Sequence, residues 1–448
     1  MNIQKLIQKI LFLSLVSWIF LQAQASTVKE TRDLLIEAIR SGDHDSVESI
    51  LDGGAETNYF LSDGASPLAW AVETQDKKLV QMLLVAGADP DAFISASTAP
   101  LILACQYGSP EILDLLLADG ANVNVELSDG ITALSVCAGN ASVSVVEQLI
   151  ASGADVKQAD QKGQTPLMWA AAKGNIENIN LLLEYGADVN SLTEKGFTPL
   201  FFALKSGVSQ APVIVLKAGG DPEHVAPDGT TVVQLAMYQG AYDFAAMMIE
   251  RGVDLNAFDR NGNQLLHAAV LADQPSLVSL LLNKGSEINE LTGESKVIWR
   301  YERNFSSKDY YVPPKSSLIL AAEQGFAEVM KLLSDSGSDT NFETEEGMNV
   351  VLSATNSGKL EALKAALEIF PHPNTANNDG QTPLHLLLGN DPVPDTESMM
   401  ALLKEKGAEI DIENSAGQTA FDIFKDAQQE AKEAFEKIFN EEVEALEL

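Results

Sequence analysis

The sequence repeats itself with a period of about 33 residues, and this period constrains the fold more than any other feature of the chain. One column holds proline or another apolar residue and runs through Pro67, Pro100, Ala133, Pro166, Pro199, Val232 and Leu265. A glycine column follows in phase, at Gly54, Gly87, Gly120, Gly153, Gly186, Gly219, Gly252 and Gly285. Self-similarity at this spacing indicates an array of repeats in which each repeat stacks on its neighbours.

The residues of one repeat predict two antiparallel helices. Thr165 can cap the first helix, and Pro166 at its first position loses no hydrogen-bond donor that the helix needs. Leu167, Ala170 and Ala171 form a narrow face that lets the helices approach closely, and the leucines at 181–183 give the second helix a buried side. Gly186 suits the left-handed position that ends that helix. Because one repeat cannot bury both of its faces, neighbouring repeats must stack.

The stretch DQKGQTPLMWAAAKGNIENINLLLEYGADVN, residues 160–190, resembles the ankyrin repeat. The resemblance extends over nearly all of residues 30–420. It implies an all-α ankyrin-repeat solenoid of about eleven or twelve helix-turn-helix repeats with β-hairpin fingers. It also implies recognition of a protein partner through finger tips and the exposed face of the first helices, which in this repeat means Gln161, Lys162, Gln164, Ala172 and Lys173.

The two ends of the chain differ from the array. Lys5 and Lys9, an apolar run over 10–21 and the small-residue site AQA at 23–25 predict a secretory signal peptide over residues 1–25, the alternative being an N-terminal membrane anchor. We therefore expect an exported bacterial protein, periplasmic or secreted, whose array spans residues 26–420. Residues 421–448 predict one acidic amphipathic helix that caps the array, with a partner-binding helix as the alternative.

Composition argues against several functions. The net charge of −35 becomes −37 without the signal peptide, and such an excess repels nucleic acid and anionic membranes. The sequence holds no recognisable catalytic or metal-binding motif, so we expect no catalytic residues, no cofactor, no metal and no enzymatic activity. The resemblance assigns His267 and His385 a structural role, in hydrogen bonds between neighbouring loops.

Two kinds of side chain have competing interpretations. Cys105 and Cys137 lie on the first helices of adjacent repeats, where they could remain buried thiols or form a disulfide after export. Trp70 and Trp169 each follow a column proline by three residues. This position favours packing between repeats over ligand binding.

The period breaks after Leu265, because the next column member is Ser317, whereas an unbroken period would place it at Ile298. All the extra residues fall within one finger, over 290–315, which we expect to be an extended β-hairpin. A smaller insertion, of four residues, falls in the loop over 389–396, between two paired helices.

The long finger is basic and aromatic in an acidic chain, with a net charge of +3 over residues 296–315. Aromatic residues and arginine are enriched at binding hot spots. The candidate contact residues are Trp299, Arg300, Tyr301, Arg303, Phe305, Tyr310 and Tyr311. The finger could reach out to a partner or fold back on a concave face of the array that we expect to be acidic.

These observations favour an extracytoplasmic protein–protein interaction scaffold. It would bind a protein partner through the finger tips, the first-helix face and the long finger, and we expect it to be a monomer. The alternative is an acidic inhibitor or immunity-type regulator that blocks a basic enzyme or toxin, with an affinity that falls steeply with salt.

Overall fold

The computed structural model describes residues 28–93, 99–294 and 313–447. The chain divides into two compact units, Met1–Asp221 and Pro222–Leu448. The helices of the N-terminal unit occupy residues 28–41 and α2 (His44–Asp52), α3 (Pro67–Glu73), α4 (Lys77–Val85), α5 (Pro100–Tyr107), α6 (Pro110–Ala118), α7 (Ala133–Asn140), α8 (Val143–Ala151), α9 (Pro166–Lys173), α10 (Ile176–Glu184), α11 (Pro199–Lys205) and α12 (Gln210–Lys217).

The C-terminal unit continues the same alternation of first and second helices. Its helices are α13 (Val232–Tyr238), α14 (Tyr242–Arg251), α15 (Leu265–Leu271), α16 (Pro275–Asn283), α17 (Ser317–Gln324), α18 (Ala327–Asp335), α19 (Val350–Asn356), α20 (Leu360–Ile369), α21 (Pro383–Gly389), α22 (Thr396–Glu405), α23 (Ala420–Phe424), α24 (Gln429–Ile438) and α25 (Asn440–Glu447).

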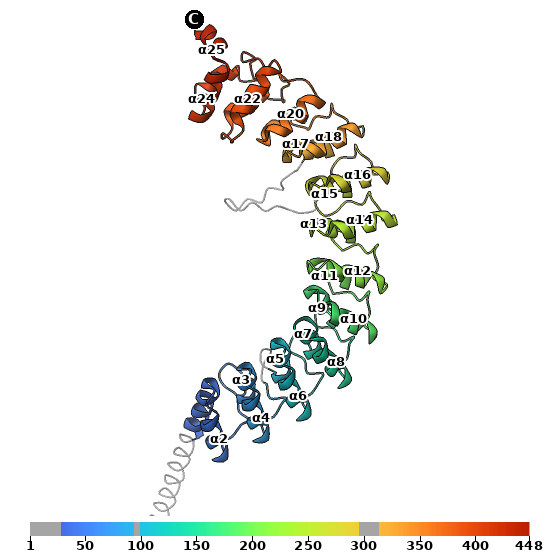
Figure 1. Cartoon of the computed structure of the whole chain (residues 1–448), viewed down its shortest axis with the longest axis vertical. Helices are drawn as coiled ribbons and strands as arrows, with labels where there is room; N and C mark the ends of the chain where they lie inside the picture. The colour runs from blue at the N-terminus through green and yellow to red at the C-terminus, as the bar shows by residue number, and fades with distance from the viewer. Residues whose placement is uncertain (1–27, 94–98, 295–312, 448) are drawn as a thin grey trace, which may run out of the picture. The chain divides into compact units, whose positions relative to one another are not determined.

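Within each unit, first helices pack on first helices and second helices on second helices. In the N-terminal unit, α3, α5, α7, α9 and α11 form one row and α4, α6, α8, α10 and α12 the other, on opposite sides of the unit (Figure 1). In the C-terminal unit the odd-numbered helices from α13 to α23 form one row, and the even-numbered helices from α14 to α24 form the other. The helical solenoid expected from the period is therefore the fold of each unit.

The repeat over 160–190 shows why these residues form helices. The Thr165 hydroxyl accepts the N–H of Met168 at 3.4 Å, and Pro166 opens α9. Gly186 has a φ of 83°, and the next N–H, of Ala187, bonds back to the carbonyl of Leu182 at 2.9 Å. Leu182 is fully buried, so the second helix supplies core as well as ending in this cap.

The recurring asparagine of the loops has a structural role that the sequence pattern did not reveal. Asn190 donates to the carbonyl of Gly219 at 3.0 Å and accepts the N–H of Asp221 at 2.8 Å, one repeat further on. Asn58, Asn124 and Asn374 make the same pair of bonds in their repeats. These side chains satisfy loop groups that no helix can pair, and they tie each repeat to the next.

The β-hairpin fingers that we expected are not seen in the described residues, which contain isolated antiparallel bridges and no strand, and most of the long finger lies outside those residues. The bridges are Glu126↔Thr132, Val225↔Thr231 and Leu291↔Ser316. A short turn replaces the ladder in an ordinary finger: Asp160 accepts the N–H groups of Lys162 and Gln164, each at 2.8 Å. With the backbone donors satisfied by one carboxylate, few residues remain to pair as strands.

The C-terminal segment also differs from the single capping helix that we expected. It forms α23, α24 and α25, and Thr419 with Asp422 makes a capping box at the start of α23. The phenylalanine rings nevertheless gather in one cluster, with Phe435 at 5.0 Å from Phe424 and 4.9 Å from Phe439 between ring centroids. α23 and α24 thus form a further, shortened helix pair that packs on α21 and α22, and α25 follows it.

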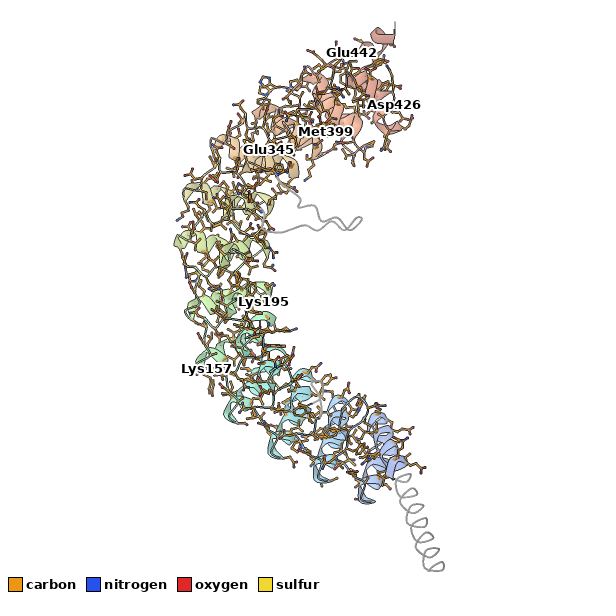
Figure 2. All side chains as sticks on the ribbon, turned by 180° about the vertical axis from the view of Figure 1, so that it is seen from behind. Lys157, Lys195, Glu345, Met399, Asp426 and Glu442 are labelled. Atoms are coloured by element: carbon orange, nitrogen blue, oxygen red, sulfur yellow. A yellow bond between two sulfur atoms is a disulfide. The ribbon has the colours of Figure 1, made fainter. Side chains whose placement is uncertain are left out.

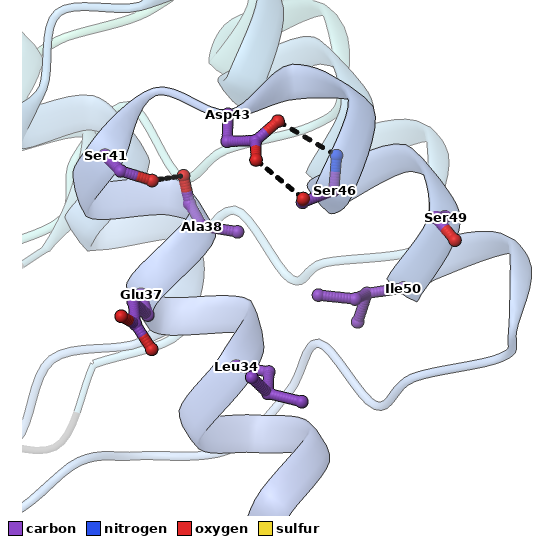
Figure 3. Close-up of a pocket in the computed structure, with 8 residues that line it drawn as sticks. All are labelled: Leu34, Glu37, Ala38, Ser41, Asp43, Ser46, Ser49 and Ile50. Carbon is purple, nitrogen blue, oxygen red and sulfur yellow. Dashed lines mark hydrogen bonds between the residues drawn. The ribbon is translucent and has the colours of Figure 1, made fainter.

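At the N-terminal end, the first repeat leaves a hollow of about 410 Å³ between the helix over 28–41 and α2 (Figure 3). Two of its polar side chains are engaged locally: Asp43 accepts the N–H of Ser46 at 3.1 Å, and Ser41 donates to the carbonyl of Ala38 at 3.1 Å. Leu34, at its rim, is 56% exposed. These contacts cap helix ends and form no catalytic arrangement.

Candidate protein-interaction surface

We use the term recognition face for the finger tips and the exposed ends of the first helices. On this face Lys162, Ala172 and Lys173 are exposed, as the resemblance implied. Gln161 is committed to structure, because its side-chain amide donates to the carbonyl of Ser128 in the preceding finger at 2.8 Å. Gln164 is half-buried within its own finger. Of these five candidate positions, Gln164 is thus the one that is not exposed, and Gln161 is exposed but bonded to the preceding finger.

Charge is distributed unevenly between the two rows of helices. The ten first helices from α3 to α21 contain only four charged residues, Glu73, Lys173, Lys205 and Glu323. The ten second helices from α4 to α22 contain thirteen acidic and seven basic residues. The first helices therefore contribute little charge to the surface, because they are short and mostly buried. The charge lies on the second helices and loops, which have more contact with water.

The seven candidate contact residues of the long finger, Trp299, Arg300, Tyr301, Arg303, Phe305, Tyr310 and Tyr311, lie outside the described residues. The base of this finger is described and is paired. Leu291 bridges Ser316, and Thr292 donates its N–H to the carbonyl of Lys315 at 2.9 Å. In the ordinary finger the equivalent bridge joins Glu126 to Thr132. The insertion therefore lies between two bridge partners and leaves the pairing register unchanged.

The finger base is also fixed to the neighbouring elements of the C-terminal unit. The Lys315 ammonium pairs with the Glu323 carboxylate on α17 at 2.7 Å. On the other side, Gly293 donates its N–H to the carbonyl of Gly262 at 2.7 Å. A Cβ on Gly262, whose φ is 79°, would lie 2.1 Å from the Gly293 carbonyl oxygen, so glycine is required at this close approach.

The two histidines hold loops together, as expected. His267 donates from Nε2 to the carbonyl of Glu290 at 3.0 Å and accepts the N–H of Gln264 on Nδ1 at 3.1 Å. His385 makes the equivalent bond to the carbonyl of Gln418 at 3.0 Å. Because Glu290 begins the long finger, His267 fixes the start of that finger to the first helix α15.

Lowering the pH should weaken the C-terminal unit through His267. Burial lowers the pKa of His267, and it outweighs the bond to Glu290 and the charge of Asp259, which act in the opposite direction. An unfolded chain takes up a proton below the ordinary histidine pKa of about 6.5, whereas the folded chain resists it until lower pH. The stabilising contribution is therefore complete above about pH 6.5 and is lost as the pH falls below it.

The measurement is the urea midpoint of wild type and His267→Leu at about pH 7.5 and about pH 5.5, which lie on either side of that pKa. The variant should be less stable at the higher pH, and its midpoint should change less between the two. Equal changes in both proteins would contradict this role for His267.

A disulfide joins Cys105 on α5 to Cys137 on α7, with the two Cα atoms 4.5 Å apart. Both side chains are fully buried. Cys105 and Cys137 are therefore joined by a disulfide in the structure and are not free thiols.

Trp70 and Trp169 are half-buried, and the Arg40 guanidinium covers the Trp70 ring at 3.8 Å from its centroid.

The fold and this face define a class: stacked helical repeats that present variable surface residues from a constant scaffold. A comparison with known families matches ankyrin repeats, in a three-copy form, over residues 35–127, 101–193, 134–219, 200–292 and 318–421. The chain belongs to the ankyrin-repeat family, whose members generally mediate protein–protein interaction. A search of curated proteins found no significant match. No helix in the described ranges is both long and apolar enough to cross a membrane.

Proposed function

We propose that this protein is an extracytoplasmic scaffold that binds another protein through its recognition face and its long finger. The observation that carries the proposal is the finger insertion, which lies between Leu291 and Ser316 without altering that bridge. The bridge at the base of the finger is kept, and the inserted residues are rich in aromatic and basic side chains. This combination favours a binding role for the insertion. Insertions in repeat arrays usually lie on the binding face.

Two further features support an exported location. The basic and apolar residues over 1–25 are typical of a secretory signal peptide. A buried disulfide fits an oxidising compartment, since disulfides are rare where glutathione keeps thiols reduced. We expect the mature bacterial protein to begin near Ser26, which mass spectrometry of the protein recovered from the cell envelope would check.

Deleting residues 293–311 should abolish partner capture while leaving the helices intact. The deletion removes the whole insertion and restores the length of an ordinary finger. Affinity capture from the native envelope, with wild type and the deletion variant side by side, is the measurement. A variant with a glycine–serine segment of equal length is the matched control, because it keeps the spacing and removes only the side chains. A partner recovered equally with all three proteins would exclude the finger as its site.

The alternative function, an acidic inhibitor or immunity-type regulator, has support from the charge on the second helices. A basic enzyme or toxin would dock on that side of the array, and its affinity would fall steeply with ionic strength. Capture that persists at high salt and depends on the long finger would favour the scaffold over the inhibitor.

A further inference from the structure

Three exposed apolar or aromatic side chains gather in two consecutive repeats of the C-terminal unit, and we call them the apolar patch: Val225, Tyr238 and Phe258. Their exposed fractions are 50%, 42% and 37%, respectively. Among the side chains described for this unit, no other large apolar side chain is exposed. Exposed apolar side chains that are scattered singly are ordinary, whereas their concentration in one place marks an interaction surface.

Tyr238 is anchored beside Phe258. It is the last residue of α13, and its hydroxyl donates to the buried carboxylate of Asp259, which directly follows Phe258 in the chain. The side-chain amide of Asn263 donates to the same hydroxyl at 3.3 Å. Burial, together with the bond to Asp259, raises the pKa of Tyr238 to about 12, so the hydroxyl stays protonated at neutral pH. The ring is therefore held in one place while it remains exposed, as suits an aromatic anchor.

Val225 and Phe258 occupy equivalent positions in consecutive fingers, one period apart. One buried side chain, that of Gln234, ties these two fingers together. Its oxygen accepts the N–H of Thr231 at 2.8 Å, and its nitrogen donates to the carbonyl of Ala257 at 2.7 Å. Thr231 is the bridge partner of Val225, and Ala257 directly precedes Phe258. Because stacked repeats present equivalent positions on the same side, Val225 and Phe258 share one exposed surface.

The apolar patch continues into the base of the long finger. The Phe258 ring lies against Gly293, since a Cβ on Gly293 would stand 3.2 Å from Cδ1 of that ring. Gly293 is also fixed to the finger of Phe258 through its bond to the carbonyl of Gly262, at 2.7 Å. The patch and the base of the long finger therefore form one continuous surface. A partner that is held by the long finger would meet the patch beside it.

Carboxylates are concentrated in the fingers that carry the patch and in the base of the long finger. These segments are residues 222–231, 253–264 and 286–294. Together they contain seven acidic residues and one basic residue, Arg260, which pairs with Asp228 at 3.6 Å. Carboxylates continue beyond them, with Glu345 in the following finger and Glu442 on α25 (Figure 2). An apolar surface with an acidic rim complements a segment whose apolar side chains are flanked by cations.

We infer that the apolar patch binds an extended segment of the partner protein whose apolar side chains are flanked by arginine or lysine. This inference rests on the proposed function and specifies the chemistry of the partner. Apolar side chains of the segment cover Val225 and Phe258, and its cations pair with carboxylates of the rim. An anionic membrane fits less well, because it would meet a chain with a net charge of −35. A second copy of the chain also fits less well, because a symmetric contact would bring acidic fingers against acidic fingers.

The test is a fluorescence anisotropy assay with the mature full-length protein and labelled peptides of about twelve residues, which in extended form can cross neighbouring fingers. The first peptide alternates leucine with serine and carries arginines at both ends. The second replaces the arginines by glutamates, and the third replaces the leucines by serine. Vesicles of phosphatidylcholine and phosphatidylglycerol test binding to an anionic membrane instead.

The decisive comparison is between two variants that lose the same kinds of side chain. The patch variant combines Val225→Ser with Phe258→Ser and keeps Tyr238, because its hydroxyl bonds to a buried carboxylate. The control variant combines Val85→Ser with Phe60→Ser, two side chains of the N-terminal unit that are 83% and 41% exposed. Val225→Ser alone is a further variant that preserves the fold, because the bridge at this residue is a backbone interaction. The glycine–serine variant of the long finger is measured beside them.

We expect wild type to bind the arginine-flanked leucine peptide about tenfold more tightly than either other peptide, with an affinity that falls as salt rises. The patch variant should lose about tenfold in affinity for that peptide and Val225→Ser about threefold, while the control and glycine–serine variants stay within about twofold of wild type.

The inference is overturned if no peptide binds wild type, if the glutamate or serine peptide binds equally well, if the patch and control variants weaken alike, or if the patch binds the vesicles instead. A glycine–serine variant that binds more tightly than wild type would also overturn it, because the long finger and not a partner would then cover the patch. Partner capture that depends on the long finger can survive each of these outcomes, so the proposed function stands or falls separately.

Discussion

Replacing Phe435 by alanine should destabilise the C-terminal unit by about 3–5 kcal/mol, the range for truncating a fully buried phenylalanine. The ring lies between those of Phe424 and Phe439, so its loss removes two aromatic contacts and leaves a cavity under α24. The measurement is urea unfolding followed by circular dichroism, with hydrogen exchange to locate the loss of protection. We expect protection to fall first in α22 to α25, since stability in a repeat array depends on contacts between neighbours.

Glu436→Ala on the same helix is the matched control. Glu436 is exposed, so its replacement should change stability by no more than about 0.5 kcal/mol. A loss of stability in Phe435→Ala no larger than this would show that the aromatic cluster is not what caps the array.

Removing the disulfide should destabilise the N-terminal unit by about 3–4 kcal/mol, because the bridge joins cysteines at a sequence separation of 32 and limits the freedom of that loop in the unfolded chain. The double variant Cys105→Ala, Cys137→Ala removes the bridge, and its unfolding midpoint in urea should fall accordingly. Both sulfurs are fully buried, so we expect reductant to act only when the unit opens.

Reduced wild type, refolded in the presence of reductant, is the control that separates the bridge from the side chains. It should lose most of the stability that the double variant loses. Titration of two free thiols in the unfolded, unreduced protein would contradict the bridge altogether.

Much of the fold could be predicted from local sequence because a repeat array is built from contacts between neighbours. The repeat period, the Thr165 cap and the Gly186 turn each act locally or between adjacent repeats, and the structure shows all of them. The smaller insertion was equally visible, and it lies between the end of α21 at Gly389 and the start of α22 at Thr396. The family match follows from the same signal.

The candidate surface was predictable only in part. A single repeat indicated the exposed positions Lys162 and Lys173, but it also indicated Gln161, whose amide bonds to the preceding finger. The bond of Gln161 could not be read from one repeat, because it depends on how residues from separate repeats meet.

The sequence by itself determined the helix pairs, the stacking order and the place of the long finger, since each follows from periodic local chemistry. Only the tertiary structure decided that Cys105 and Cys137 are bridged, that the C-terminal segment breaks into three helices, and that charge avoids the first helices. These features depend on distances and burial between elements that are remote in the chain. Hydrophobic periodicity specifies which face of a helix is buried, and only packing specifies what that face meets.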